Sequence, residues 1–255
     1  MLERWVWGDT PLGYRKVSWN NERLMLVREG LDPDLIATKI LLPMGSREES
    51  STFFGRGRLR RVRFENGGDV LLRAYHHGGF FRRVTGKCFF TWPARPFREL
   101  VITEKVRQRG IPTLEILAAF VERSWGPFYH GWLVTRELGG AEDLWMVLRK
   151  GLYAGDGRSL LQAVARGIRQ MHVHGVYHAD LNLKNILVRR ENRGISAYVI
   201  DFDKARLYPG GVPLELANRN LNRLLRSVRK LDPKKKVLSE EDWDVFMGFY
   251  QLRDC

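Results

Sequence analysis

Apolar and polar positions alternate in the first half of this 255-residue chain and take helical spacing in the second half. Residues 60–64 and 70–75 alternate on either side of Asn66-Gly67-Gly68, which predicts a β-hairpin. Residues 127–138 alternate aromatic and aliphatic side chains and also predict strands. Two further apolar segments can be strands or packing segments: residues 5–7 and 36–42.

Start and stop signals delimit two helices. Residues 95–109 have Pro96 in the first turn and Gly110 just past the end. A second helix is expected to begin with Ser159 as its N-cap and to end at Gly175, because apolar residues between them recur at i, i+3, i+4 and i+7.

The C-terminal third combines short strands with two more helices. Short strands are expected at 176–177, 186–188 and 198–200. Residues 215–231 form a helix with leucine and valine on one face and arginines mainly off it. Ser239-Glu240-Glu241-Asp242 resembles a capping box for a last helix.

This order of elements predicts an α+β, bilobal fold, with a small β-rich N-lobe, a larger helical C-lobe and a cleft between them. We expect the N-lobe to cover residues 51–138 and the C-lobe residues 139–255. Residues 1–50 are expected to be an N-terminal extension of unclear role that packs on the N-lobe.

Two segments in the second half carry the clearest chemistry: His178-Ala179-Asp180-Leu181-Asn182-Leu183-Lys184-Asn185 and Val199-Ile200-Asp201-Phe202-Asp203. Phosphoryl transfer needs alignment and charge neutralisation more than covalent help from the protein. Asp180 can accept or orient the proton of an acceptor hydroxyl, and Lys184 can neutralise charge on the transferring group. Asn185 and Asp201 offer the hard oxygen ligands that Mg²⁺ prefers.

The spacing of the two segments makes the prediction specific. A His-x-Asp triplet alone occurs often by chance in surface and capping positions, whereas the triplet followed by Asn185 and then by Asp201 after a strand predicts a kinase site. His178 is interpreted as a structural hydrogen-bonding residue rather than a base. Asp203 is either a second acid near the metal or the cap of the following turn.

With these motifs the chain resembles the protein-kinase-like superfamily, and within it the bacterial lipopolysaccharide kinases, above all the Kdo (3-deoxy-D-manno-octulosonic acid) kinases. The resemblance covers residues from about 50 to 231. Besides the two segments, it rests on Gly55-Arg56-Gly57, the run from Val70 to Gly79, Phe97-Arg98-Glu99-Leu100, Val134 to Leu138, and Asn220 to Leu224.

The resemblance implies an ATP-binding half. Arg73 stands where protein kinases place a lysine on the third strand, and Glu99 is its expected partner. Arginine can keep this role because it stays charged and can bind phosphate and carboxylate through a bidentate fork. The remaining expected nucleotide contacts are the loop glycines Gly55 and Gly57, and the backbone of the hinge residues Glu137 and Leu138.

The charge of the chain suggests where its acceptor lies. Forty-three Lys and Arg against 29 Asp and Glu give a net charge of +14, which favours anionic partners. Together with this charge, the resemblance implies an anionic lipid A-linked sugar as acceptor, met at the cytoplasmic face of the bacterial inner membrane by a cytoplasmic, peripheral enzyme. The chain shows no recognised nucleic-acid motif, signal peptide or spanning apolar run, and two cysteines make no disulfide framework.

The sequence leaves three functions open. The first is a sugar kinase acting on Kdo, or on a heptose of the lipopolysaccharide core. The second is a small protein or RNA-linked kinase of the RIO or tRNA-modification type. The third is a pseudokinase or anionic-surface binding module, against which the presence of Asp180, Lys184, Asn185 and Asp201 argues. The short segment after Phe202, without Ala-Pro-Glu, argues against a conventional protein kinase.

Overall fold

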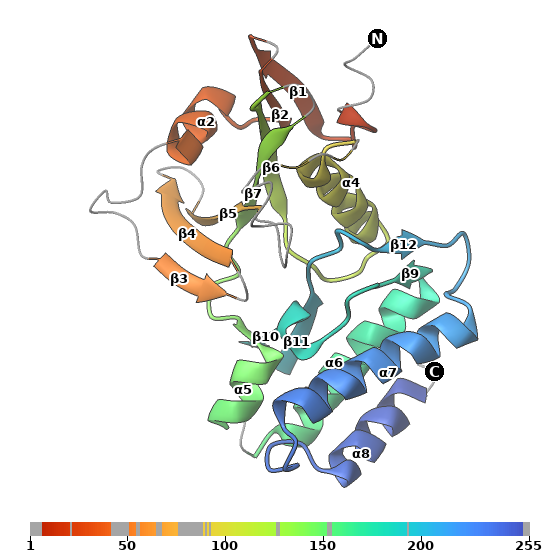
Figure 1. Ribbon diagram of the computed structural model, residues 1–255. Coiled ribbons are helices and arrows are strands. Elements are labelled where there is room, and N and C mark those ends of the chain that lie inside the picture. Colours follow the sequence, from red (N-terminus) through yellow and green to blue (C-terminus); the bar gives the residue numbers. More distant parts are fainter. Residues whose placement is uncertain are drawn as a thin grey trace. The chain divides into compact units, whose positions relative to one another are not determined.

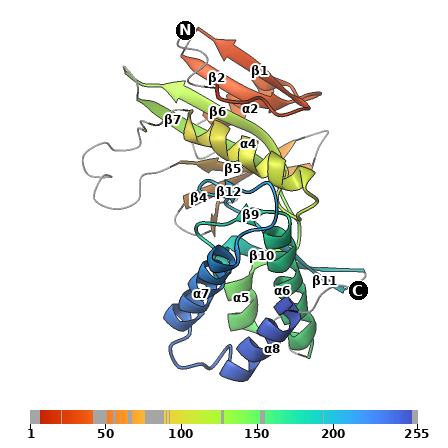
Figure 2. The ribbon, with the colours of Figure 1, turned by 90° about the vertical axis from the view of Figure 1, so that its right-hand side faces the viewer.

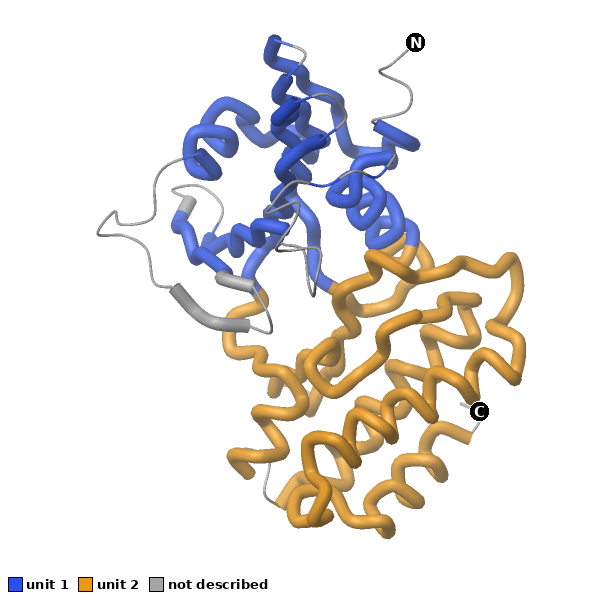
Figure 3. The backbone as a smooth tube through the Cα atoms, in the orientation of Figure 1, with its two compact units in different colours: residues 1–105, 114–137 blue, residues 106–113, 138–255 orange. Residues whose placement is uncertain are grey.

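The chain forms two compact units in the computed structural model, coloured in Figure 3. Unit 1 contains residues 1–105 and 114–137, and unit 2 contains residues 106–113 and 138–255. The structure describes residues 7–20, 22–41, 51–54, 57–64, 68–75, 89, 91, 93–125, 128–151, 155–192 and 194–251.

Unit 1 is built on a seven-stranded antiparallel sheet with the order β1-β2-β6-β7-β5-β4-β3 (Figure 1). Its strands are β1 (Tyr14–Trp19), β2 (Arg23–Arg28), β3 (Ser51–Phe54), β4 (Gly57–Phe64), β5 (Gly68–Ala74), β6 (Ile116–Arg123) and β7 (Tyr129–Arg136). The predicted hairpin is confirmed as β4 and β5, in which Val62 pairs with Val70.

Two helices cover the opposite faces of this sheet, as Figures 1 and 2 show. Helix α4 (Arg95–Gln108) confirms the helix predicted at 95–109, and it packs Phe97 and Leu100 on one face. Helix α2 (Pro33–Leu41) packs Ile36 and Ile40 on the other face. Alternate residues of β2 thus enter separate cores, Leu24 and Leu26 on one side and Met25 and Val27 on the other, as the period of two requires.

Of the two alternatives for residues 36–42, the strand is wrong, because residues up to Leu41 belong to α2, whose Ile36 and Ile40 pack in the core. The Asp32 carboxylate accepts hydrogen bonds from the backbone N–H groups of Asp34 and Leu35 at 2.9 and 3.3 Å, which satisfies donors at the start of the helix. Ile36 and Ile40 are four residues apart and therefore share the face that packs on the sheet.

Part of the N-terminal segment adds two strands, β1 and β2, to the sheet of unit 1. β1 and β2 form a hairpin, and β2 pairs with β6 in the seven-stranded sheet. Trp7 is buried and stacks on Phe97 of α4, with ring centroids 5.0 Å apart. The division of the chain at residues 50 and 138 stays a prediction, although clustering of contacts places residues 106–113 with unit 2.

Unit 2 combines four helices among its described residues with short strands. The helices are α5 (Leu144–Lys150), α6 (Gly157–Val173), α7 (Leu214–Leu231) and α8 (Glu240–Gln251). The strands β8 (Glu142–Asp143), β10 (Ile186–Glu191) and β11 (Gly194–Val199) form one sheet, and β9 (Val176–Tyr177) pairs with β12 (Arg206–Leu207). A single turn of 3₁₀ helix, η1 (Leu183–Asn185), precedes β10.

Helix α6 starts earlier than the sequence pattern predicts. Asp156 takes the N-cap position, without a side-chain capping bond, so the prediction of Ser159 as N-cap is wrong and Ser159 lies in the first turn. The end is as expected, because Gly175 adopts a positive φ of 72°. A Cβ there would lie 2.1 Å from the Gly210 carbonyl and 2.4 Å from the Tyr208 carbonyl, so only glycine fits.

The last two helices follow the predicted pattern. Helix α7 buries Leu221, Leu224 and Val228 on its inner face. The capping box of α8 is present: the Ser239 N–H donates to the Asp242 carboxylate at 2.9 Å, and the Asp242 N–H donates to the Ser239 hydroxyl at 3.1 Å. Among the described residues, no helix combines the length and apolar character that a membrane span requires.

Candidate active site

The loop from His178 to Asn185 connects β9 to β10 in unit 2 and is fixed mainly through His178. This side chain is 1% exposed. Its Nδ1 accepts a hydrogen bond from the Asp180 N–H at 3.1 Å, so Nε2 carries the proton and donates to the Ile200 carbonyl at 2.9 Å. Burial lowers the pKa of His178. A neutral imidazole that bridges the two segments supports the structural role predicted for His178.

A buried network missed by the sequence interpretation holds this loop from behind. The Asn220 side chain on α7 donates to the His178 carbonyl at 2.7 Å and accepts from the His178 N–H at 3.1 Å. Asn220 also bonds His172 of α6 at 3.1 Å, and His172 bonds the hydroxyl of Tyr250 on α8 at 2.8 Å. Three helices therefore position the backbone that carries Asp180. The sequence signal was Asn220, a polar residue on the apolar face of a helix.

His172 should make stability depend on pH. Burial lowers its pKa from 6.5 to about 4, so below pH 6.5 the unfolded chain binds a proton that the folded chain does not. The contribution of His172 to the free energy of unfolding is fully present above pH 6.5 and falls by roughly 3 kcal/mol as the pH decreases to 4. Urea unfolding of the wild type and of His172→Gln across this range measures the effect. Equal slopes of unfolding free energy against pH in both proteins would contradict it.

Asp180 and Asn185 are joined at the open end of the loop. The Asn185 amide nitrogen donates to the Asp180 carbonyl at 2.9 Å, and the Asn182 amide donates to the same oxygen at 2.8 Å. Because a carbonyl only accepts, Asn185 must present its NH₂ group here, which directs its Oδ1 away from that bond. The Asp180 carboxylate is 58% exposed. The loop thus offers a carboxylate and an amide oxygen.

Asp201 follows β11 and lies beside Asn185 along the backbone, because the Ile200 N–H donates to the Asn185 carbonyl at 3.0 Å. Its φ is +67°, a left-handed conformation that costs a non-glycine residue energy. Such strain persists only where the surrounding structure imposes it, often at functional sites. The next residues, Phe202 and Asp203, are buried at 0% and 3% exposure, and the Phe202 ring packs 5.1 Å from His178.

Two cations and one acid complete the surroundings of the loop. Arg223 of α7 places Nη1 3.8 Å from the Asp180 carboxylate. Lys184 is exposed on η1 and lies near Asp143. Burial raises the pKa of Asp143, and the positive charge of Lys184 offsets part of that rise. Asp143 itself caps α5 by accepting the Met146 N–H at 2.9 Å.

In unit 1, Arg73 and Glu99 form the ion pair that the resemblance implied. Arg73 lies on β5, and Glu99 lies on α4 with 3% exposure. Since β3, β4 and β5 are the strands after residue 50, Arg73 is on the third of them. The Tyr75 hydroxyl donates to the same carboxylate, and the Arg73 guanidinium packs 5.1 Å from the Tyr75 ring. The tyrosine was not predicted as part of this cluster.

The other expected nucleotide contacts are less defined. Gly55 and the stretch His76-His77-Gly78-Gly79 lie outside the described residues, and Gly57 opens β4. The Glu137 N–H donates to the Asp69 carbonyl at 2.9 Å, and its carboxylate pairs with Arg61. The Leu138 carbonyl accepts from the Ala141 N–H at 3.1 Å. The Glu137 N–H and the Leu138 carbonyl are therefore already hydrogen-bonded within the protein. The Glu137 carbonyl and the Leu138 N–H are the groups left for the predicted contact with the nucleotide.

The donors present suit a hard cation. Within the described part of the chain, no three His, Cys, Asp or Glu side chains gather into a metal-binding group. An amide oxygen of Asn185 and a carboxylate of Asp201 nevertheless fit Mg²⁺, which commonly takes few protein ligands and completes its shell with water and phosphate oxygens. The residue roles predicted for this loop stay predictions at this point.

The fold is that of a protein-kinase-like protein. A solved structure described as "WaaP in complex with acyl carrier protein" shares this fold, with a TM-score of 0.55 at 20% identity over 89% of this chain and 85% of that one. This likeness confirms the predicted fold class.

Residues 48–250 match the model of the lipopolysaccharide kinase (Kdo/WaaP) family, and the chain belongs to this family. The 3-deoxy-D-manno-octulosonic acid kinase of Pasteurella multocida is 30% identical over 72% of this chain and 76% of its own length. That of Vibrio vulnificus strain CMCP6 is 31% identical over 71% of this chain and 75% of its own length. The predictions of the family and of a kinase are confirmed.

Proposed function

We propose that this enzyme transfers the γ-phosphoryl group of ATP to a hydroxyl of Kdo on a lipid A-linked lipopolysaccharide inner-core precursor. The observation that carries the proposal is the loop from His178 to Asn185, with Asp180 exposed beside an oriented Asn185, in a chain that belongs to the lipopolysaccharide kinase family. Relatives at 30 and 31% identity carry the name of Kdo kinases, which supports this sugar as the acceptor.

The reaction can be assigned to this chain's own groups. Asp180 takes the proton of the attacking hydroxyl, whose oxygen forms the new bond to phosphorus as the bond to the leaving ADP breaks. Asn185 and Asp201 would hold Mg²⁺, which when bound neutralises charge on phosphate oxygens. Lys184 neutralises charge on the transferring group. Arg73, oriented by Glu99 and Tyr75, binds phosphate of the nucleotide.

We further propose that the enzyme works as a peripheral protein at the cytoplasmic face of the inner membrane. Its net charge of +14 favours an anionic lipid surface, at roughly 1 kcal/mol for each cation near that surface. The acceptor itself is anionic and lipid-linked, so attraction to the surface also brings enzyme and acceptor together.

The proposal is tested by offering one enzyme preparation several acceptors. Purified full-length protein with γ-labelled ATP and Mg²⁺ should label a Kdo–lipid A precursor, and should not label the same precursor without Kdo. A heptose-bearing core, a general protein mixture and tRNA serve as competing acceptors. Labelling of protein or tRNA but not of lipid would refute the proposal of a sugar kinase. Labelling that requires heptose would show that heptose, and not Kdo, is the acceptor.

Arg73→Ala should weaken use of the nucleotide. Loss of the guanidinium removes a phosphate contact, so we expect the KM for ATP to rise by about tenfold or more. It also leaves the buried Glu99 carboxylate with one partner fewer, which should lower the unfolding free energy by about 1–3 kcal/mol. Steady-state kinetics and urea unfolding measure both. Arg73→Lys, which keeps the charge, should retain more activity; a normal KM and turnover in Arg73→Ala would mean that the third strand is misassigned.

A further inference from the structure

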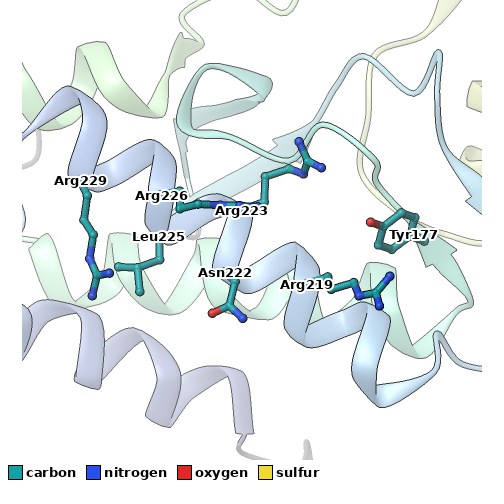
Figure 4. Close-up of a pocket in the computed structure, with 7 residues that line it drawn as sticks. All are labelled: Tyr177, Arg219, Asn222, Arg223, Leu225, Arg226 and Arg229. Carbon is teal, nitrogen blue, oxygen red and sulfur yellow. The ribbon is translucent and has the colours of Figure 1, made fainter.

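A hollow beside helix α7 is lined by seven residues, of which four are arginines (Figure 4). Its volume is about 500 Å³. We call it the arginine pocket, and it is lined by Tyr177, Arg219, Asn222, Arg223, Leu225, Arg226 and Arg229. The pocket lies wholly in unit 2, and Tyr177, which precedes His178 directly, forms its end beside the loop.

The arginines share one face of α7 by helical spacing. Arg219, Arg223 and Arg226 stand at i, i+4 and i+7, and Arg229 follows one turn later. The opposite face buries Leu221, Leu224 and Val228 in the core. In Figure 4, Arg219 and Arg223 extend toward the end where Tyr177 lies, and Arg229 stands at the other end of the row. The four arginines of the pocket therefore lie along one side of α7.

The positive charge of the pocket is poorly compensated by the protein. Among the described residues that line it there is no carboxylate. The side chains of Arg219 and Arg226 make no hydrogen bond or ion pair with any residue in the described part of the chain. Arg229 interacts electrostatically with the exposed Glu240 at the start of α8. Like charges at this spacing destabilise a helix, so the row costs stability unless an anion binds there.

Arg223 joins the pocket to the candidate base. Its Nη1 lies 3.8 Å from the Asp180 carboxylate, which is longer than a hydrogen bond. Its Nε is buried and has no hydrogen-bond partner among the described residues. The Arg223 side chain is 41% exposed, so an oxyanion in the pocket can pair with its guanidinium, and a hydroxyl on the same molecule would then lie close to Asp180.

We propose that the arginine pocket is the acceptor's oxyanion site, which binds a carboxylate or phosphate of the acceptor and thereby places its hydroxyl at Asp180. The inference rests on the proposed function, and the names of the relatives make its chemistry concrete: 3-deoxy-D-manno-octulosonic acid is an acid, ionised at neutral pH. Guanidinium groups bind carboxylate and phosphate through paired N–H donors, which fixes direction as well as charge. A phosphate on the lipid is the other source of the same chemistry.

Pocket variants should separate acceptor binding from nucleotide binding. Arg219→Ala and Arg226→Ala are expected to raise the KM for the acceptor by about tenfold each, with the KM for ATP within about twofold of wild type. Lys230→Ala, which removes an exposed cation from α7 outside the pocket, is the matched control and should leave both values unchanged. Unchanged acceptor KM in both pocket variants, in a preparation whose wild type phosphorylates Kdo–lipid, would overturn the inference and leave the function intact.

Modified acceptors distinguish the two sources of the oxyanion. If the carboxylate is bound, its methyl ester should raise the wild-type acceptor KM by about tenfold and should add little to the defect of Arg226→Ala. If a phosphate is bound, removal of the phosphate from the lipid should instead raise the wild-type acceptor KM and add little to the defect of Arg226→Ala. If the effects of the methyl ester and of dephosphorylation on the acceptor KM each add fully to the effect of Arg226→Ala, neither the carboxylate nor the phosphate contacts the pocket.

A titration without turnover tests the pocket even if the proposed function fails. Free Kdo and inorganic phosphate are added separately to the full-length protein and followed by calorimetry. We expect binding of at least one of them to wild type and to Lys230→Ala, and a loss of about tenfold or more in affinity in Arg219→Ala and Arg226→Ala. Equal affinity in all four proteins, or none in the wild type, would refute an oxyanion site here.

Discussion

Asp180→Asn should lower turnover by about a thousandfold, because a neutral amide cannot accept the proton of the attacking hydroxyl. The fold should be retained. The bonds that hold this part of the loop use the backbone of Asp180, whose N–H donates to His178 and whose carbonyl accepts from Asn182 and Asn185. Its side chain makes one exposed ion pair at 3.8 Å with Arg223, worth about 1 kcal/mol or less.

Steady-state transfer to the Kdo–lipid acceptor, with unfolding followed in parallel, measures this effect. Asp244→Asn is the matched control, since it makes the same chemical change at an exposed position on α8. We expect the control to keep wild-type turnover and Asp180→Asn to keep the wild-type KM for ATP. Turnover of Asp180→Asn within about fivefold of wild type would remove Asp180 from the role of general base.

Asp201→Asn is expected to reduce turnover by a similar factor through loss of a charged ligand for Mg²⁺. Stability should not fall with it. Asp201 has a φ of +67°, and asparagine tolerates this left-handed conformation at least as well as aspartate. Asp201→Ala should lose activity and also about 1 kcal/mol of stability, because alanine has no such tolerance.

The pair of variants separates metal binding from backbone strain. Activity is measured over a range of Mg²⁺ concentrations, and unfolding is measured by urea. Asp201→Asn with wild-type stability but little activity at any Mg²⁺ concentration is the expected result. Normal turnover of Asp201→Asn at saturating Mg²⁺ would exclude a role as metal ligand.

Features that depend on local sequence were predictable. The segments around Asp180 and Asp201, the hairpin of β4 and β5, and helices α4 and α7 follow from short-range spacing, turn residues and apolar periodicity. Helix α2 was missed because it has only nine residues, and Asp32 as its N-cap was not recognised. The pattern places the N-cap of α6 at Ser159 because the helix begins before its first apolar residue, with Asp156 as N-cap.

Features that depend on contacts distant in sequence were not predictable from the pattern. Asn220 bonds the backbone of His178, 42 positions earlier, and Tyr75 joins Glu99 from 24 positions away. Arg73 and Glu99 were paired only through the resemblance to the kinases. The arginines of α7 were visible as charge, but their arrangement around a hollow beside Asp180 required the structure.

The most direct test of a Kdo kinase is to locate the transferred phosphate. Kdo–lipid A precursor, ATP and Mg²⁺ are incubated with wild-type protein, and the product is followed by phosphorus NMR and fragmented by mass spectrometry. We predict one new phosphomonoester on a Kdo hydroxyl, formed in step with ADP and absent with Asp180→Asn. Release of ADP without a phosphorylated sugar, or phosphate on any group other than Kdo, would contradict the proposed function.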